Sequence, residues 1–150
     1  MMDRMEIVMK KIIAIALAMC AVLGLAACAN FNIKDPDELV TALTEKGCSA
    51  KLIETQKEIT SFLGFFGINN IKGITDLVVA DGSEGDTVKP LMVAYCNSKE
   101  ATERTRENVS GAIEDIAEFF GVSVEECKLL IADNAVLVGH PDMIDLTKGF

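Results

Sequence analysis

The residues best suited to chemistry in this 150-residue chain are its cysteines and its single histidine. Besides Cys28, the chain beyond its first 27 residues contains Cys48, Cys96, Cys127 and His140. A thiol beside an imidazole is the arrangement of a cysteine nucleophile with its general base, so Cys96 or Cys127 with His140 would make a small thiol enzyme. The chain has no nucleophile motif that supports this pairing. Because His140 directly precedes a proline, we expect it at a helix start or on the surface.

The spacing of the cysteines defines no metal or redox site. Cys48, Cys96 and Cys127 form no Cys-x-x-Cys pair, so we expect small buried thiols, with one disulfide and one free thiol as the alternative. The acidic loop 81–86 lacks the alternating ligands of a calcium-binding loop and predicts a hairpin turn. No phosphate or dinucleotide fingerprint occurs. The sequence therefore predicts no catalytic residue, metal ligand or cofactor.

One group of aromatic residues could form a binding surface. Ile59, Phe62, Leu63 and Phe66 repeat at the helical period, whereas Phe65 lies outside that apolar stripe and would face away from the core. Exposed aromatic side chains that gather on one face are typical of interaction sites. We therefore take Phe62, Phe65 and Phe66 as a candidate partner surface, and core packing is the alternative for the group.

The first 27 residues have the pattern of a secretory signal peptide. Lys10 and Lys11 precede an uncharged apolar stretch over residues 12–27, which matches the charged and hydrophobic regions of such signals. Two acidic residues among the first eight do not fit a positively charged start. We therefore expect translation to begin at Met9.

The end of this leader resembles the lipobox of bacterial lipoprotein precursors. The residues that carry the resemblance are Leu25-Ala26-Ala27-Cys28, directly after the apolar stretch. The resemblance covers residues 9–29. It implies that signal peptidase recognises Leu25, Ala26 and Ala27, that cleavage occurs before Cys28, and that this cysteine becomes diacylglycerated. We therefore expect the protein on the extracytoplasmic side of the cell membrane, where the lipid anchors it.

Charge restricts the partners of the remaining chain. Residues 28–150 contain 11 Lys or Arg and 21 Asp or Glu, which gives a net charge of −10. Nucleic acid is an unlikely partner for such a surface because phosphate binding needs clustered basic residues. We expect residues 28–34 to be the lipidated cysteine with a short tether and residues 35–150 to be one domain.

Hydrophobic periodicity and turn residues predict the elements of that domain. The first half contains a helix capped by Asp35 and ended by Gly47, a strand over 49–55, a helix from 59 to Gly67, and strands over 74–80 and 88–96. One long helix follows, from a capping box at Asn97 and Glu100 to Gly121. The chain then forms a short turn at 123–126, strands over 128–132 and 135–139 around Asp133-Asn134, and a terminal helix from Pro141.

Two features of the central strand are expected from its sequence. Leu91, Val93 and Tyr95 should lie on one face and Met92, Ala94 and Cys96 on the other, and Pro90 places the start of the strand at a sheet edge. The element order predicts an α+β fold, an antiparallel or mixed sheet with helices mainly on one face, of ferredoxin-like general type.

The function predicted from the sequence is that of a membrane-anchored, non-enzymatic binding or interaction module of the cell envelope. Its partners would be the membrane, through the N-terminal lipid, and an envelope protein. An inhibitor-like protein that occupies a partner's groove, and a thiol enzyme that uses Cys96 or Cys127 with His140, are the alternatives.

Overall fold

The computed structural model describes residues 31–149, which form five α-helices, one 3-10 turn and five strands. The elements are α2 (Pro36–Glu45), β1 (Ser49–Ile53), α3 (Gln56–Gly64), β2 (Ile74–Asp81), β3 (Pro90–Cys96), α4 (Lys99–Gly111), α5 (Ile113–Phe120), η1 (Val124–Glu126), β4 (Lys128–Ala132), β5 (Ala135–Gly139) and α6 (Pro141–Asp145). The predicted signal peptide, the start at Met9 and the motif Leu25-Ala26-Ala27-Cys28 lie outside the described residues.

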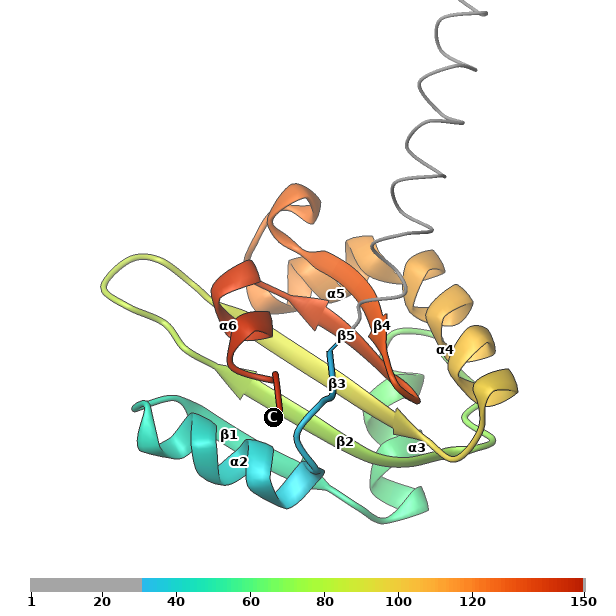
Figure 1. Cartoon of the computed structure of the whole chain (residues 1–150). Helices are drawn as coiled ribbons and strands as arrows, with labels where there is room; N and C mark the ends of the chain where they lie inside the picture. The colour runs from blue at the N-terminus through green and yellow to red at the C-terminus, as the bar shows by residue number, and fades with distance from the viewer. Residues whose placement is uncertain (1–30, 150) are drawn as a thin grey trace, which may run out of the picture.

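The strands form one antiparallel sheet in the order β1-β2-β3-β5-β4 (Figure 1). β3 is the central strand, and its side chains alternate between the two faces as predicted. Pro90 begins this strand, so the expectation that it marks a sheet edge is wrong. A proline is tolerated here because it is the first residue, and its carbonyl accepts a hydrogen bond from the N–H of His140 at 2.9 Å.

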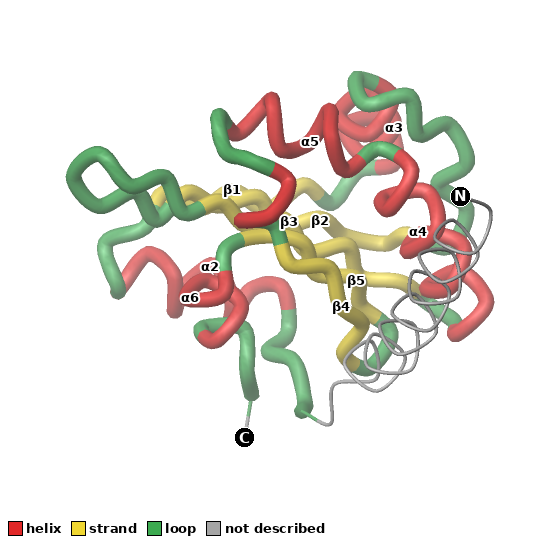
Figure 2. Tube along the Cα trace, turned by 90° about the horizontal axis from the view of Figure 1, so that it is seen from above, coloured by secondary structure: helices red, strands yellow, loops and turns green. Residues whose placement is uncertain are grey.

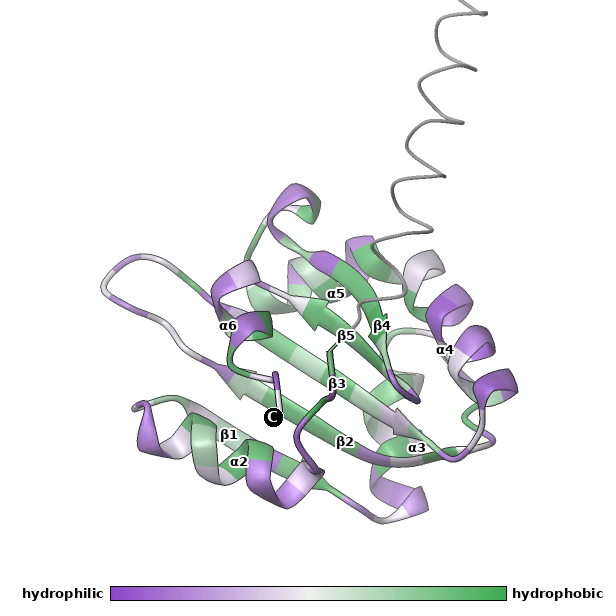
Figure 3. Cartoon of the chain, in the orientation of Figure 1, coloured by the Kyte–Doolittle hydropathy of each residue, from purple (hydrophilic) through white to green (hydrophobic). Residues whose placement is uncertain are grey.

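Apolar residues cover both faces of the sheet, and each face has its own helices. α3, α4 and α5 pack on one face around Leu63, Met92 and Ile116, whereas α2 and α6 pack on the other around Leu39 and Leu137. Figure 2 shows the sheet between these two groups, and Figure 3 shows that the strands are the most hydrophobic part of the fold. The predicted α+β fold is confirmed, and the helices lie mainly on one face, with three of the five described helices there and two on the other.

The long helix predicted up to Gly121 is divided in two. The division lies at Ala112, where φ is −105° and ψ is 7°, directly after Gly111. Glycine weakens a helix because its backbone gains freedom on leaving the helical conformation. The N-cap of α4 is Ser98 rather than Asn97. As a result α5 follows its own direction (Figure 1), and Phe119 near its end contacts Phe62 and Phe65 of the α3 region.

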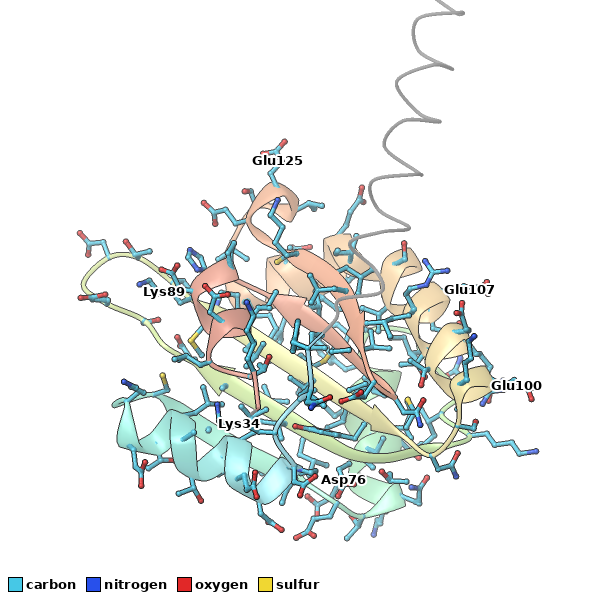
Figure 4. All side chains as sticks on the ribbon, in the orientation of Figure 1. Lys34, Asp76, Lys89, Glu100, Glu107 and Glu125 are labelled. Atoms are coloured by element: carbon cyan, nitrogen blue, oxygen red, sulfur yellow. The ribbon has the colours of Figure 1, made fainter. Side chains whose placement is uncertain are left out.

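The segment before α2 is part of the domain rather than a free tether. The N–H of Lys34 donates to the carbonyl of Thr147 at 2.9 Å, and the hydroxyl of Tyr95 donates to the carbonyl of Lys34 at 2.7 Å. Ile33 packs against the apolar cluster below α2 and α6. Figure 4 shows Lys34 beside the C-terminal end of the chain. Residues 31–34 of the expected tether, residues 28–34, are therefore held against the domain.

Candidate binding groove

A groove of about 810 Å³ lies where the edge strand β1 meets α3 and α5. Lys51 and Ile53 of β1 line one side of it. Phe62 of α3, Phe65 at the end of that helix and Phe119 of α5 line the other. The groove thus joins two consecutive elements, β1 and α3, to α5, which comes much later in the sequence.

The groove is walled by a cluster of edge-to-face phenylalanine rings. The ring centroid of Phe119 lies 6.2 Å from Phe62, 5.7 Å from Phe65, 5.4 Å from Phe66 and 5.2 Å from Phe120. Centroid separations of about 4.5–7 Å with tilted rings are the favourable geometry for aromatic pairs. Phe119 therefore joins α5 to α3.

The predicted surface residues and the additional groove residue Phe119 differ in exposure. Phe65 is 73% exposed and Phe119 is 51% exposed, whereas Phe62 is half-buried. Phe66 is only 5% exposed and belongs to the core, so its assignment to the partner surface is wrong. The helical period had placed it on the apolar stripe, and that stripe is what packs against the sheet.

The position of Phe65 follows from how α3 begins and ends. Thr55 caps the helix by accepting a hydrogen bond from the N–H of Glu58 at 3.2 Å. Ile59 and Leu63 are fully buried and hold the helix on the sheet. Gly67 has a φ of +78°, which turns the chain back toward the core after the helix. Phe65 is left on the outer side of that turn.

The polar rim of the groove is locally basic. Its charged lining residues are Lys51, Lys57 and Glu58, which sum to +1, although residues 28–150 carry −10. No salt bridge to Lys51 or Lys57 occurs within the described part of the chain. Both ammonium groups are therefore available to an anionic ligand.

The structure does not bring the candidate thiols and the histidine into a catalytic arrangement. The Sγ of Cys96 lies 3.7 Å from the hydroxyl of Thr105, and burial raises the pKa of the thiols of both Cys96 and Cys127. The Nδ1 of His140 accepts a hydrogen bond from the N–H of Asp142 at 3.1 Å and so caps α6. No hydrogen bond joins the imidazole to a thiol in residues 31–149.

The three cysteines of the described region are free thiols. Cys96 and Cys127 are buried as expected, and Cys48 is half-buried with its sulfur 4.0 Å from that of Met143. The alternative of one disulfide and one free thiol is therefore wrong for Cys48, Cys96 and Cys127. A raised thiol pKa lowers the fraction of the reactive thiolate at neutral pH, which is the opposite of what a nucleophile needs.

Alkylation of the native protein at pH 8 by iodoacetamide should distinguish these thiols. Cys48 is expected to react first, and Cys96 and Cys127 at least about tenfold more slowly, because burial limits both access and ionisation. Their rates should rise only at a higher pH than for a free cysteine. Mass spectrometry of tryptic peptides gives each rate.

The same measurement tests His140. The His140→Asn variant keeps a capping side chain, so its melting temperature and its three alkylation rates should match the wild type. A slower reaction of Cys96 or Cys127 in this variant would restore the thiol-enzyme hypothesis.

The described residues also bear on metal binding, on the acidic loop and on membrane-spanning helices. Residues 31–149 contain no group of three or more side chains arranged to hold a metal ion. In the acidic loop 81–86, the carboxylate of Asp81 accepts a hydrogen bond from the N–H of Ser83 at 2.8 Å, as expected of a hairpin turn. Among the described helices, none has the length and apolar character needed to span a membrane.

Comparison of the chain with protein-family models, curated proteins and solved structures finds no match. Two observations therefore bear on function, namely the leader sequence and the groove. The sequence had predicted Phe62 and Phe65 but not Lys51, Ile53 or Phe119. Phe119 carried the same local signal as Phe65, since it lies off the apolar stripe that includes Phe120.

Proposed function

We propose that the protein is a lipid-anchored module on the extracytoplasmic side of the cell membrane that binds another envelope protein through the aromatic groove, without catalysing a reaction. The observation that carries this proposal is the pair of exposed rings, Phe65 and Phe119, brought from two helices to one groove. Large aromatic side chains are seldom left in water together unless a partner covers them.

The leader supports the anchor. Cys28 follows small residues and an apolar stretch, as in lipoprotein precursors. The described chain begins at Phe31, which lines a small pocket with Leu130 of β4 and Ile144 of α6. Since three residues span at most about 10 Å, a lipid on Cys28 would hold this side of the domain close to the membrane.

The groove lies far from that attachment point. Phe31 is near the β4 edge on the face covered by α6, whereas the groove is at the β1 edge on the face covered by α3 and α5. Five strands about 4.8 Å apart place the two edges roughly 19 Å from each other. An anchored domain would thus present the groove to soluble or neighbouring proteins rather than to its own membrane.

Site-specific photo-crosslinking in intact cells tests the proposal. A photoreactive phenylalanine analogue at position 65 or 119 should give a covalent adduct with another protein, found in the membrane fraction. Glu125 is the control position because it is exposed at the tip of η1, away from the groove (Figure 4). Equal adducts at all three positions, or none at 65 and 119, would contradict the groove as the binding site.

A further inference from the structure

We propose that the groove binds an extended, acidic segment of the partner protein, which adds a sixth strand to the sheet along β1. In this arrangement an acidic side chain lies opposite Lys51, and an apolar side chain two residues away fills the space below Phe65. The inference rests on the proposed function, because it names the occupant of the same groove.

The first observation is that β1 is an unpaired edge. It pairs with β2 on one side and ends the sheet on the other. In the described part of the chain, no backbone hydrogen bond from Ser49–Ile53 extends beyond that pairing. Outward N–H and C=O groups of an edge strand are the template for strand addition by a peptide.

The second observation is that the groove continues from this edge. Lys51 and Ile53 are two residues apart in a strand, so their side chains point to the same face, and both line the groove. A strand paired with β1 would place every second side chain on that face as well. Those side chains would enter the space bounded by Phe62, Phe65 and Phe119.

The third observation is charge, which decides between an acidic partner and a second copy. Lys51 is the central residue of β1. Symmetric antiparallel pairing of two copies centred on this residue would set Lys51 against Lys51, and like charges directly opposite are destabilising. An acidic side chain opposite Lys51, with Lys57 nearby, is the complementary arrangement.

The other edge of the sheet differs. Beside β4 lies a smaller pocket of about 320 Å³, and the chain's own Phe31 helps to line it. Phe31 thus lies in the smaller pocket beside β4, whereas β1 has a larger groove lined by exposed aromatic rings. Strand addition is expected at β1.

The test uses the mature protein, purified from membranes and held in lipid nanodiscs. The probe is a synthetic eight-residue peptide, labelled with fluorescein at its amino end and amidated at its carboxyl end, with the repeating order Thr-Glu-Thr-Phe, so that Glu and Phe share one face of a strand. The control peptide has Lys at each Glu position. Fluorescence anisotropy gives the affinities, and hydrogen exchange reports protection of individual amides.

The acidic peptide should bind at least about tenfold more tightly than the basic one, and it should slow the exchange of alternate amides within Ser49–Ile53. Lys51→Glu should reverse the preference for the two peptides. Phe65→Ser should weaken the binding of both peptides. Lys128→Glu is the matched control, because it changes an exposed lysine on the opposite edge strand and should have no effect.

Several results would overturn the proposal. These are equal affinity for the two peptides, no response to Lys51→Glu, and binding without protection of β1. If the β1 amides became protected from exchange without peptide, and more so at higher protein concentration, the occupant of the groove would be a second copy of the chain. If vesicles of anionic phospholipid protected these amides, the occupant would be a membrane. If the peptides fail while crosslinks at position 65 persist in cells, only strand addition is wrong, whereas loss of both results removes the proposed function too.

Discussion

A Cys28→Ser chain is expected to carry no lipid and to accumulate as the longer, unprocessed precursor. The physical reason is that a thiol is the group that is acylated at a lipobox, and a serine hydroxyl is a much weaker nucleophile at neutral pH. Labelling cells with a radioactive fatty acid should give a band for the wild type and none for the variant. The expected effect is a complete loss of the lipid label.

Cys48→Ser is the matched control, since it also removes one sulfur from the chain but lies in the folded domain. Its label and its processed length should equal those of the wild type. A lipid label that persisted in Cys28→Ser would refute the anchor. It would leave the groove unaffected, because residues 31–149 make the groove without the leader.

Local sequence patterns predicted those parts of the fold that local forces determine. The alternation along β3 and the β4–β5 hairpin are both present as expected. At the hairpin turn Asp133 has a φ of +52°, a conformation that Asp and Asn tolerate better than other side chains. The residues that specify these features are neighbours in sequence, so a short window contains the whole signal.

The assembly of the groove was not predictable in this way. Phe119 contacts Phe62 and Phe65, which lie far earlier in the chain. Such contacts depend on packing between distant segments, which a short window of sequence does not contain. The same limit applies to the tether, whose docking depends on Thr147 and Tyr95 far along the chain.

Phe65 and Phe66 show that two residues of the same type can occupy different environments. They are adjacent, identical residues, and the helical period alone suggested that one leaves the core. Phe66 packs among Phe62, Phe119 and the apolar residues of the α3 face. Phe65 contributes its ring to the rim of the groove.

Phe66→Ala is therefore expected to lower the free energy of unfolding by about 3–5 kcal/mol, a large share of the roughly 5–15 kcal/mol typical of a domain. Phe65→Ala removes the same atoms from a side chain that is 73% exposed, and it should cost about 1 kcal/mol or less. Urea denaturation measures both: the midpoint should fall strongly for Phe66→Ala and little for Phe65→Ala, with similar slopes.

If the two variants lost equal stability, Phe65 would be a core residue and the groove would lose its principal exposed ring. If Phe66→Ala were as stable as the wild type, the cluster around Phe119 would not hold α3 and α5 together, and strand addition at β1 would lack a fixed wall to pack against.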